Sequence, residues 1–496
     1  MAEQTEDRDC ASPSVWRFAR ATRAHVVIDA EAYFELVRDA MLASRQRIFL
    51  IGWDFDTRIK LSGGRRWWNL PRKDRYPARL GAFVVWLVRR ASALDVKLLK
   101  WNFGAIRYLF RGTMIVDLVR WFINRSIEFK FDAAHPVGCS QHEKIAIIDD
   151  RLAVCGGIDL TSDRWDTRAH LPEDPRRRRA SGRLYPPWHD VTMMMEGEVA
   201  GALGELGRQR WKRAGGVPMA PCAPQEESPW PKRLVAEFRD VEVGISRTRA
   251  EYDGEPGVFE IEALFVEQIE RARRFVYVES QYFASRTIAE TIARRLAEPD
   301  PPEFLLVTPL MADGWLQQAV MDIARIRLFR ALGEVDRLGR FRAFVPFTAG
   351  DTPIYVHAKL MIVDDEIIRI GSANMNNRSM GLDSECDVFV DTTRPGNAHV
   401  CPAIRRIRLS LLAEHCGIDP ADVEELLERH GSMAKMIDSL PGQGKRLEPF
   451  ALRPLSDTEK ALADSAFFDP ERPGEYFEPI ARRGLFRRGG MLRRPK

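Results

Sequence analysis

Two short segments of the chain carry the same reactive side chains at the same spacing. The sequences HEKIAIID (142–149) and HAKLMIVD (357–364) each hold a histidine, a lysine two residues later and an aspartate five residues after the lysine. The second copy begins 215 residues after the first, and GGID at 156–159 aligns with GSAN at 371–374 without a gap. A repeat of this kind predicts two related half-domains. Two imidazoles and two ammonium groups brought together would form a site for an anionic phosphate.

Histidine suits phosphoryl transfer because both of its protonation states exist near neutral pH. A neutral imidazole can attack phosphorus and hold the phosphoryl group covalently. A protonated imidazole can donate to the leaving oxygen and later accept a proton from water or an alcohol. His142 and His357 are therefore the candidate catalytic histidines, and Lys144 and Lys359 are expected to neutralise the non-bridging phosphate oxygens.

Asp149 and Asp364 are the last of the six motif residues and are counted with the catalytic set because they belong to the motif. We interpret their role as structural. On a strand, side chains alternate between the two faces, so a residue five positions after the lysine lies on the opposite face. We expect these two aspartates to pair with or cap the following turn.

Each catalytic histidine also needs an acidic partner on its other ring nitrogen. The sequence offers one candidate in each half, at the start of the strand that follows the motif: Asp190 in WHDVTMMM and Glu385 in SECDVFV. We expect each acid to orient the histidine of its own half.

Small residues just after the motifs are candidates for binding phosphate or substrate. In the second half these are Ser372 and Asn374, and at the matching positions of the first half they are Gly157 and Asp159. A glycine and an aspartate are less suited to binding an anion, which indicates that the two halves are not functionally equal.

No metal-binding pattern accompanies these residues. Asp163, Asp166, His170 and His189 are loosely spaced and match neither a zinc nor a calcium signature. We therefore expect catalysis without a metal or any other cofactor.

Alternating strands and helices must position the candidate residues. Runs typical of strands occupy 48–53, 96–101, 127–131, 145–148, 152–155 and 191–195 in the first half, and 275–279, 304–308, 341–347, 360–363, 367–370 and 387–390 in the second. Helical periodicity occupies 30–44, 80–91, 114–124 and 258–273. This order predicts an α/β sandwich in each half, with helices covering the sheet.

The expected organisation is an N-terminal tail (1–25), a first half-domain (26–213), a linker (214–231), a second half-domain (232–418) and a helical extension with a basic tail (419–496). The first half carries about 20 extra residues, within 164–187, including four consecutive arginines at 176–179. Such an insertion could be a substrate or headgroup loop, or a solvated surface loop.

Composition describes a folded, water-soluble chain. The 496 residues are 45% hydrophobic and 29% charged, with a formal net charge of only +4, which does not favour a nucleic-acid partner. Seven scattered cysteines without a C-x-x-C pair indicate reduced thiols. The polar start of the chain is not a signal peptide, and no run is long enough to predict a transmembrane helix.

The doubled motif resembles the phospholipase D superfamily, and most closely phospholipase D proper. GSANMNNRSM at 371–380 is similar to the GSANINxRS stretch of those enzymes, and WHDV at 188–191 is similar to their P-W-H-D stretch. ESQYF at 279–283 resembles their E-N-Q-F/Y-F run, with Ser280 in place of asparagine. The resemblance covers roughly residues 26–418.

This resemblance implies two α/β halves related by pseudo-twofold symmetry, with one active site at their interface. It implies that His142 is the nucleophile and His357 the acid and base. The implied reaction converts phosphatidylcholine or phosphatidylethanolamine to phosphatidic acid and free headgroup, with transphosphatidylation to alcohols. The alternatives are a phosphatidyl transferase of the cardiolipin or phosphatidylserine synthase type and, less favoured, a phosphodiesterase acting on nucleic acid.

The expected partner is a phospholipid membrane surface, approached by a monomer without nucleic acid. We expect a cytoplasmic protein, peripheral on the inner membrane face. Candidate membrane contacts are the GGRRWW run at 63–68, the aromatic and basic segment at 102–111, and the tail at 481–496 with its seven positive charges.

Overall fold

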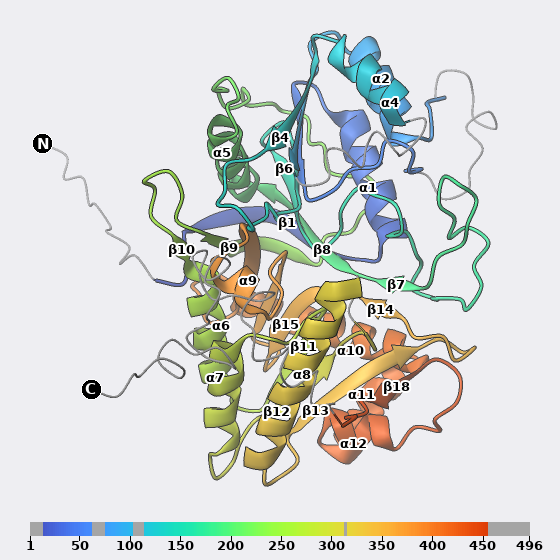
Figure 1. The fold of residues 1–496 in the computed structure, drawn as a ribbon, viewed down its shortest axis with the longest axis vertical. Coiled ribbons are helices and arrows are strands. Elements are labelled where there is room, and N and C mark those ends of the chain that lie inside the picture. The colour runs from blue at the N-terminus through green and yellow to red at the C-terminus, as the bar shows by residue number, and fades with distance from the viewer. Residues whose placement is uncertain (1–12, 62–74, 103–113, 312–314, 455–496) are drawn as a thin grey trace, which may run out of the picture.

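A computed structural model of the chain describes residues 13–61, 75–102, 114–311 and 315–454. Most strands of these segments belong to one 16-stranded sheet with helices on both faces (Figure 1). The α/β fold expected from the sequence is confirmed. The expected membrane contacts at 63–68 and 481–496, and nearly all of 102–111, lie outside the described residues.

The first half contributes seven strands to this sheet. In spatial order from the outer edge they are β4 (Ile127–Asp132), β3 (Asp95–Trp101), β2 (Arg47–Gly52), β5 (Ile145–Ile148), β6 (Leu152–Gly156), β8 (Val191–Gly197) and β1 (Arg17–Ile28). Strands β2, β3 and β4 run parallel, and the other neighbouring pairs are antiparallel.

The second half repeats this order from the opposite edge. Its strands are β13 (Phe341–Phe347), β12 (Glu303–Val307), β11 (Phe275–Ser280), β15 (Lys359–Val363), β16 (Ile367–Gly371), β17 (Glu385–Asp391) and β9 (Phe238–Arg249), with β18 (Arg446–Pro449) outside β13 and β10 (Val258–Phe259) beside β9. The halves meet where β1 and β9 pair antiparallel, so their sheets are continuous.

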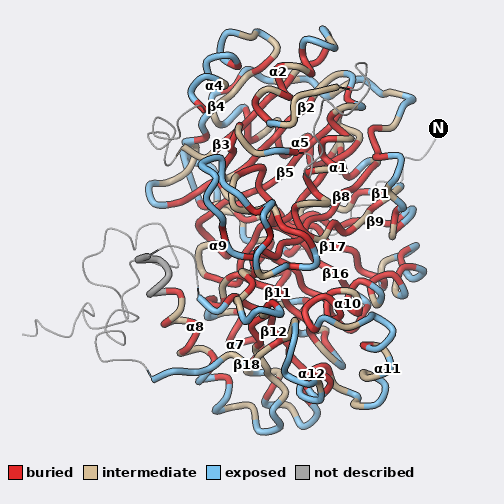
Figure 2. Tube along the Cα trace, turned by 90° about the vertical axis from the view of Figure 1, so that its right-hand side faces the viewer, coloured by how far each residue is buried: buried red, intermediate tan, exposed pale blue. Residues whose placement is uncertain are grey.

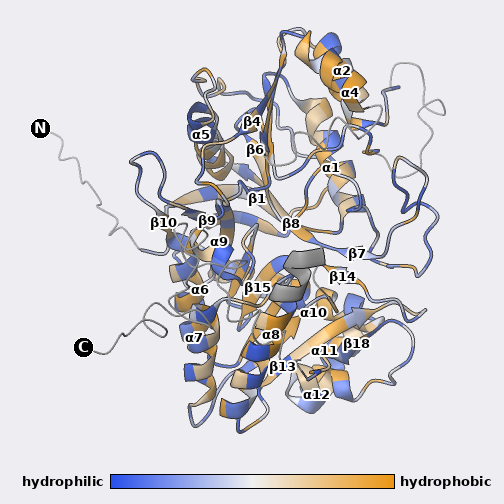
Figure 3. Cartoon of the chain, viewed as in Figure 1, coloured by the Kyte–Doolittle hydropathy of each residue, from blue (hydrophilic) through white to orange (hydrophobic). Residues whose placement is uncertain are grey.

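The three largest hydrophobic clusters among the described residues hold helices to the sheet. One extends beneath both halves and includes α5 (Glu198–Arg213), α10 (Cys401–Cys416), α11 (Pro420–His430) and α12 (Met433–Asp438). The second contains α1 (Ala30–Ala43), α2 (Leu80–Arg90) and α4 (Met114–Phe122); the third contains α6 (Glu260–Arg271), α7 (Arg286–Leu296) and α8 (Trp315–Val335). Buried residues follow the strands through the middle of the molecule (Figure 2). The outer helices α6 and α7 carry hydrophilic and hydrophobic residues side by side (Figure 3).

The expected N-terminal tail is wrong beyond residue 16, because Arg17–Ile28 forms β1 in the middle of the sheet. The buried face of β1 includes Ala19, Ala21 and Ala24. Alanine is small and common in helices, so its alternation with arginine gave no strand signal. No helix among the described residues is long and apolar enough to cross a membrane.

Candidate active site

The two motif histidines lie just before their strands, and each is fixed by the backbone of the other half. The His142 N–H donates to the carbonyl of Ser384 at 2.9 Å, and the His357 N–H donates to the carbonyl of His189 at 2.8 Å. A short parallel pairing of β7 (Trp188–His189) with β14 (Tyr355–Val356) holds the second of these contacts. The histidines are therefore positioned by contacts between the halves rather than within them.

The histidine side chains follow the same crossed pattern. Nδ1 of His142 lies 3.0 and 2.9 Å from the two carboxylate oxygens of Glu385. Nδ1 of His357 lies 2.7 Å from Oδ2 of Asp190. The expected pairing within each half is wrong, because β8 and β17 flank the β1–β9 seam and the histidine of each half reaches across it. In both pairs the Nδ1 contact leaves Nε2 for a substrate.

Glu385 is completely buried and held by two hydroxyl groups. Ser372 and Ser379 each donate a hydrogen bond to one of its carboxylate oxygens. Ser372 also accepts a hydrogen bond from the Cys386 N–H at 3.0 Å. A phosphate oxygen needs a donor, and the single hydroxyl proton of Ser372 is already used. Ser372 therefore supports the His142 partner rather than a phosphate.

Gly157 makes room for the other carboxylate. A Cβ atom at this position would lie 2.0 Å from Oδ1 of Asp190, which is closer than two unbonded atoms can approach. The Val191 N–H donates to the same oxygen at 2.9 Å. Gly157 thus serves the His357 partner, not a phosphate as the sequence suggested.

The lysines are buried beside the histidines. Lys144 Nζ donates to the His142 carbonyl at 2.8 Å and lies 3.5 Å from the carboxylate of Asp159. Lys359 Nζ donates to the His357 carbonyl and, at 3.2 Å, to Oε1 of Gln281. Asp159 is thereby an ion partner of Lys144, so the expectation that it binds phosphate is not supported by its contacts.

Asn374 is the remaining phosphate candidate. Its Oδ1 is buried and has no hydrogen-bond partner among the described residues. Exchange of the amide oxygen and nitrogen would present a donor at the same place. This side chain is therefore consistent with binding a substrate oxygen.

Burial and neighbouring cations favour neutral histidines. The pKa of His142 is lowered well below its usual value by burial, Lys144 and Lys359. The pKa of His357 is also lowered well below its usual value, by burial, Lys359 and Arg164. Neutral imidazole is the form that can attack phosphorus.

Burial also acts on the groups around the histidines. It raises the pKa of Glu385 to about 8 and that of Asp190 to about 6, and it lowers the pKa of Lys359 to about 7. A bound phosphate would reverse the effect on the cations, because an anion nearby favours their charged forms.

The motif aspartates lie at the opposite ends of their strands, in turns. Asp149 accepts hydrogen bonds from the N–H groups of residues 45–47 and from the Ser44 hydroxyl, and Asp364 accepts from the N–H groups of residues 273–275. Both have positive φ, 54° and 56°. They join each turn to the start of a neighbouring strand and do not face the histidines.

Arg164 is a functional candidate that the repeat did not reveal. It opens the 164–187 insertion and has no counterpart in the second half. Its guanidinium lies 4.2 Å from the ring centre of Trp188, and its Nε is buried without a hydrogen-bond partner among the described residues. Trp188 in turn stacks on Tyr355, with ring centres 4.5 Å apart, and lies 5.1 Å from the His357 ring.

The rest of the insertion borders a separate cavity of about 450 Å³. The arginines at 176, 178 and 179 line it, together with Arg58, Lys60 and Arg79. No catalytic candidate lines this cavity. Among the arginines of the insertion, Arg164 is the one that contacts Trp188, which lies beside the His357 ring.

The α/β fold brings two H-x-K segments together, and a buried acid contacts Nδ1 of each histidine. This arrangement defines a class of phosphoryl-transfer site. A sequence profile of phospholipase D matches residues 346–452. Phospholipase D alpha 1 of Arabidopsis thaliana is 25% identical over 412 residues, covering 58% of this chain and 50% of its own. Phospholipase D A of Dictyostelium discoideum is 23% identical over 488 residues, covering 82% and 37%. These matches support a relationship of the chain to the phospholipase D superfamily.

The chain spans about half the length of the first curated relatives it matches. Among solved structures, phosphatidylserine synthase of Haemophilus influenzae Rd KW20 superimposes with a TM-score of 0.51 at 13% identity. That match covers 84% of this chain and 95% of the synthase. The likeness supports the shared fold.

Proposed function

We propose that this protein is a phospholipase D. It would hydrolyse the distal phosphodiester of phosphatidylcholine or phosphatidylethanolamine to phosphatidic acid and free headgroup. The observation that carries the proposal is the pair of imidazoles, His142 half-buried and His357 buried, each held through Nδ1 by an acid of the opposite half. Two buried lysines beside them match the two negative oxygens that form as phosphorus is attacked.

In the first step, Nε2 of His142 attacks phosphorus and the bond from phosphorus to the headgroup oxygen breaks. His357, protonated when the anionic substrate raises its pKa, gives its proton to that oxygen. In the second step, His357 takes a proton from water as the water oxygen attacks phosphorus. The P–N bond then breaks, releasing phosphatidic acid and neutral His142.

A primary alcohol in place of water would give a new phospholipid by the same second step. Transphosphatidylation is therefore part of the proposed activity. A phosphatidyl transferase of the cardiolipin or phosphatidylserine synthase type would use the same covalent intermediate and differ only in its acceptor, so the experiment must distinguish the acceptors.

The reaction is proposed to take place at a membrane surface, with the enzyme bound peripherally. We assign it to a reducing compartment such as the cytoplasm, because all six cysteines in the described segments are unpaired. Sedimentation with phospholipid vesicles tests the first point, and thiol titration of protein purified without reductant tests the second.

The experiment uses purified full-length chain, mixed vesicles of phosphatidylcholine, phosphatidylethanolamine and phosphatidylglycerol, and added ethanol. Mass spectrometry should find phosphatidic acid and phosphatidylethanol, and the consumed lipid identifies the headgroup. Cardiolipin or another exchanged lipid without phosphatidic acid would overturn the hydrolase in favour of a transferase. The variants His142→Ala and His357→Ala should both be inactive, and activity in either would contradict the shared site.

A further inference from the structure

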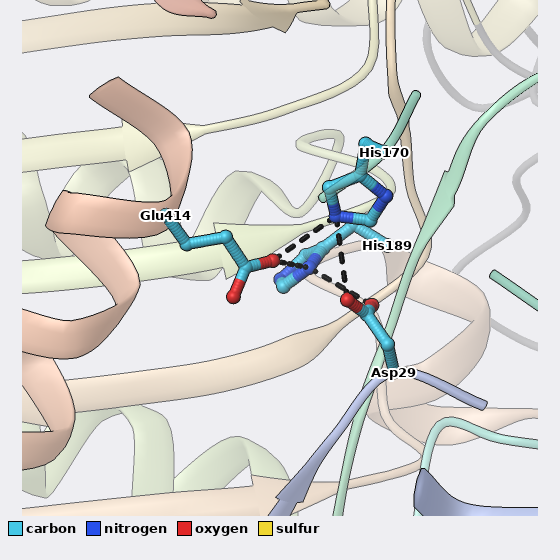
Figure 4. A group of neighbouring side chains, drawn as sticks. All are labelled: Asp29, His170, His189 and Glu414. Carbon is cyan, nitrogen blue, oxygen red and sulfur yellow. Dashed lines mark hydrogen bonds and ion pairs between the residues drawn. The ribbon is translucent and has the colours of Figure 1, made fainter. Parts of the chain in front are cut away.

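Four buried side chains from distant parts of the sequence converge in one cluster (Figure 4). Asp29 follows β1, His170 lies in the insertion, His189 ends β7 and Glu414 lies on α10. Both histidines are 0% exposed, Asp29 is 1% exposed and Glu414 is 8% exposed. The loose spacing of His170 and His189 in the sequence gave no sign of this cluster.

The inward-facing atoms of the cluster form a compact set of two nitrogens and carboxylate oxygens. Nε2 of His170 lies 3.0 Å from Oε1 of Glu414 and 3.3 Å from Oδ2 of Asp29. Nδ1 of His189 lies 3.1 Å from the same Glu414 oxygen and 3.2 Å from Oδ1 of Asp29. One ligand atom from each of the four residues lies within 4.8 Å of the other three.

The outward-facing nitrogen of each histidine is already bound to an acid. Nδ1 of His170 lies 3.0 Å from Oδ2 of Asp166, and Nε2 of His189 lies 2.8 Å from Oε2 of Glu279. Asp166 is held in place by Arg177, and Glu279 by Tyr277 and His415. An acid on the remote nitrogen is the usual way in which proteins orient a histidine that binds a metal.

This arrangement leaves the centre of the cluster without a proton donor when the histidines are neutral. A neutral imidazole has one N–H, and donating it outward leaves a lone pair facing inward. Those lone pairs then face carboxylate oxygens, which also only accept. Oδ2 of Asp29 and Nδ1 of His189 have no hydrogen-bond partner among the described residues. Such a centre needs positive charge, which either a metal ion or a second proton on each histidine would supply.

We propose that Asp29, His170, His189 and Glu414 form a structural zinc site. Zinc binds four N and O ligands tetrahedrally at about 2.0–2.1 Å, which places neighbouring ligand atoms about 3.3 Å apart. Four separations between the histidine nitrogens and the carboxylate oxygens, two of them to different oxygens of Asp29, are 3.0–3.3 Å and close to that spacing. The site is closed, because four protein ligands fill the tetrahedron and the cluster is buried.

The zinc ion would tie the insertion and α10 to the strand that carries the His357 partner. His189 directly precedes Asp190, and its carbonyl accepts the His357 N–H. The ion is therefore assigned a positioning role, outside the phosphoryl-transfer steps. This inference does not depend on which substrate the enzyme uses.

The competing arrangement puts two protons in place of the metal, so that both histidines are imidazolium ions. Hydrogen bonds and ion pairs would then hold the cluster without a metal. Arg168 binds the other Glu414 oxygen, and Lys445 donates to the Arg168 carbonyl, so both add positive charge nearby. The two arrangements have the same geometry, so metal content distinguishes them.

The test uses the full-length chain, purified without metal-affinity tags and dialysed against metal-free buffer. Elemental analysis should find zinc at about one ion per chain, as a closed structural site requires. Growth with Co²⁺ should give the intense visible bands of tetrahedral cobalt. Stripping the metal with a chelator should lower the melting temperature, and Zn²⁺ alone should restore it, because binding stabilises the folded state.

Matched variants locate the site. Glu414→Gln should lose the metal, whereas Glu428→Gln on the exposed face of α11 and His142→Ala should keep it. If Glu414→Gln fails to fold, the cobalt spectrum of the wild-type chain still decides between tetrahedral binding and none. Metal-free protein whose melting temperature does not respond to chelator or Zn²⁺ would overturn the proposal in favour of the protonated cluster. A different stoichiometric metal would overturn the zinc assignment.

Discussion

The crossed pairing predicts that each acid serves the histidine of the opposite half. In Glu385→Gln, His142 would lose a carboxylate whose two oxygens lie 3.0 and 2.9 Å from Nδ1. Attack on phosphorus makes the imidazole ring cationic, which favours the charged form of Glu385, and a buried hydrogen bond to a charged group is worth about 1.5–3 kcal/mol. At about 1.36 kcal/mol for each factor of ten, attack on phosphorus should slow by about 10- to 160-fold. No water can substitute, because Glu385 is completely buried.

The assay compares two lipids that differ only in leaving group, choline or p-nitrophenol, and follows the first turnover by rapid mixing. The p-nitrophenolate ion leaves without a proton, so its release does not need a general acid. Glu385→Gln should slow the first turnover of both lipids, because it impairs the nucleophile. Asp190→Asn should slow the choline lipid far more than the p-nitrophenyl lipid, because it impairs the acid.

The opposite pattern, with Asp190→Asn slowing both lipids and Glu385→Gln only the choline lipid, would refute the assignment of roles to the crossed pairs. Equal effects of both variants on both lipids would also refute it. The variant Glu428→Gln, which changes an exposed acid on α11, serves as the control and should leave both rates unchanged. Melting curves of each variant separate a loss of activity from a loss of folding.

Three further predictions follow from the site. Burial lowers the pKa of Lys359 to about 7, so this lysine loses its charge as the pH rises and kcat/KM should fall above about pH 7. The value of kcat should persist to higher pH, because bound phosphate favours the protonated lysine. A profile of kcat/KM that is flat to about pH 9 would contradict this. Gly157→Ala should reduce activity and lower stability by about 1–3 kcal/mol through its clash with the neighbouring carboxylate. The control Gly333→Ala, in open space on α8, should be neutral or stabilising by about 0.5–1 kcal/mol in denaturant titrations. Arg164→Gln should lower kcat/KM about 10-fold or more, as the loss of a charged donor to phosphate does; steady-state kinetics should show no loss for Arg183→Gln in the same insertion.

The residues that meet at the candidate site could be predicted from sequence where a residue type and its spacing are repeated. His142 and His357 were found in this way, and so were the two acids that contact them. The pairing of each acid with the histidine of the opposite half was not predicted. Distance along the chain does not show whether a side chain reaches across the β1–β9 junction. Arg164 was missed for the related reason that it has no counterpart in the second half.

Most strands were predicted to within a residue or two at each end, because large apolar side chains mark them. The strands β1 and β9 were missed, although they join the halves. The buried positions of β1 include the small residues Ala19 and Ala21, which weaken the alternation from which strands are predicted. In β9 the alternation is present at Val241, Val243 and Ile245 and was overlooked.

The crossed contacts also bear on how such a chain can change over generations. A gene encoding either half alone would supply a histidine without its acid. Recombination that replaced one half with that of a relative would have to bring in compatible partners for both pairs at once. The two copies of the motif are therefore expected to be inherited as a single unit, although the linker at 214–231 offers an obvious place for exchange.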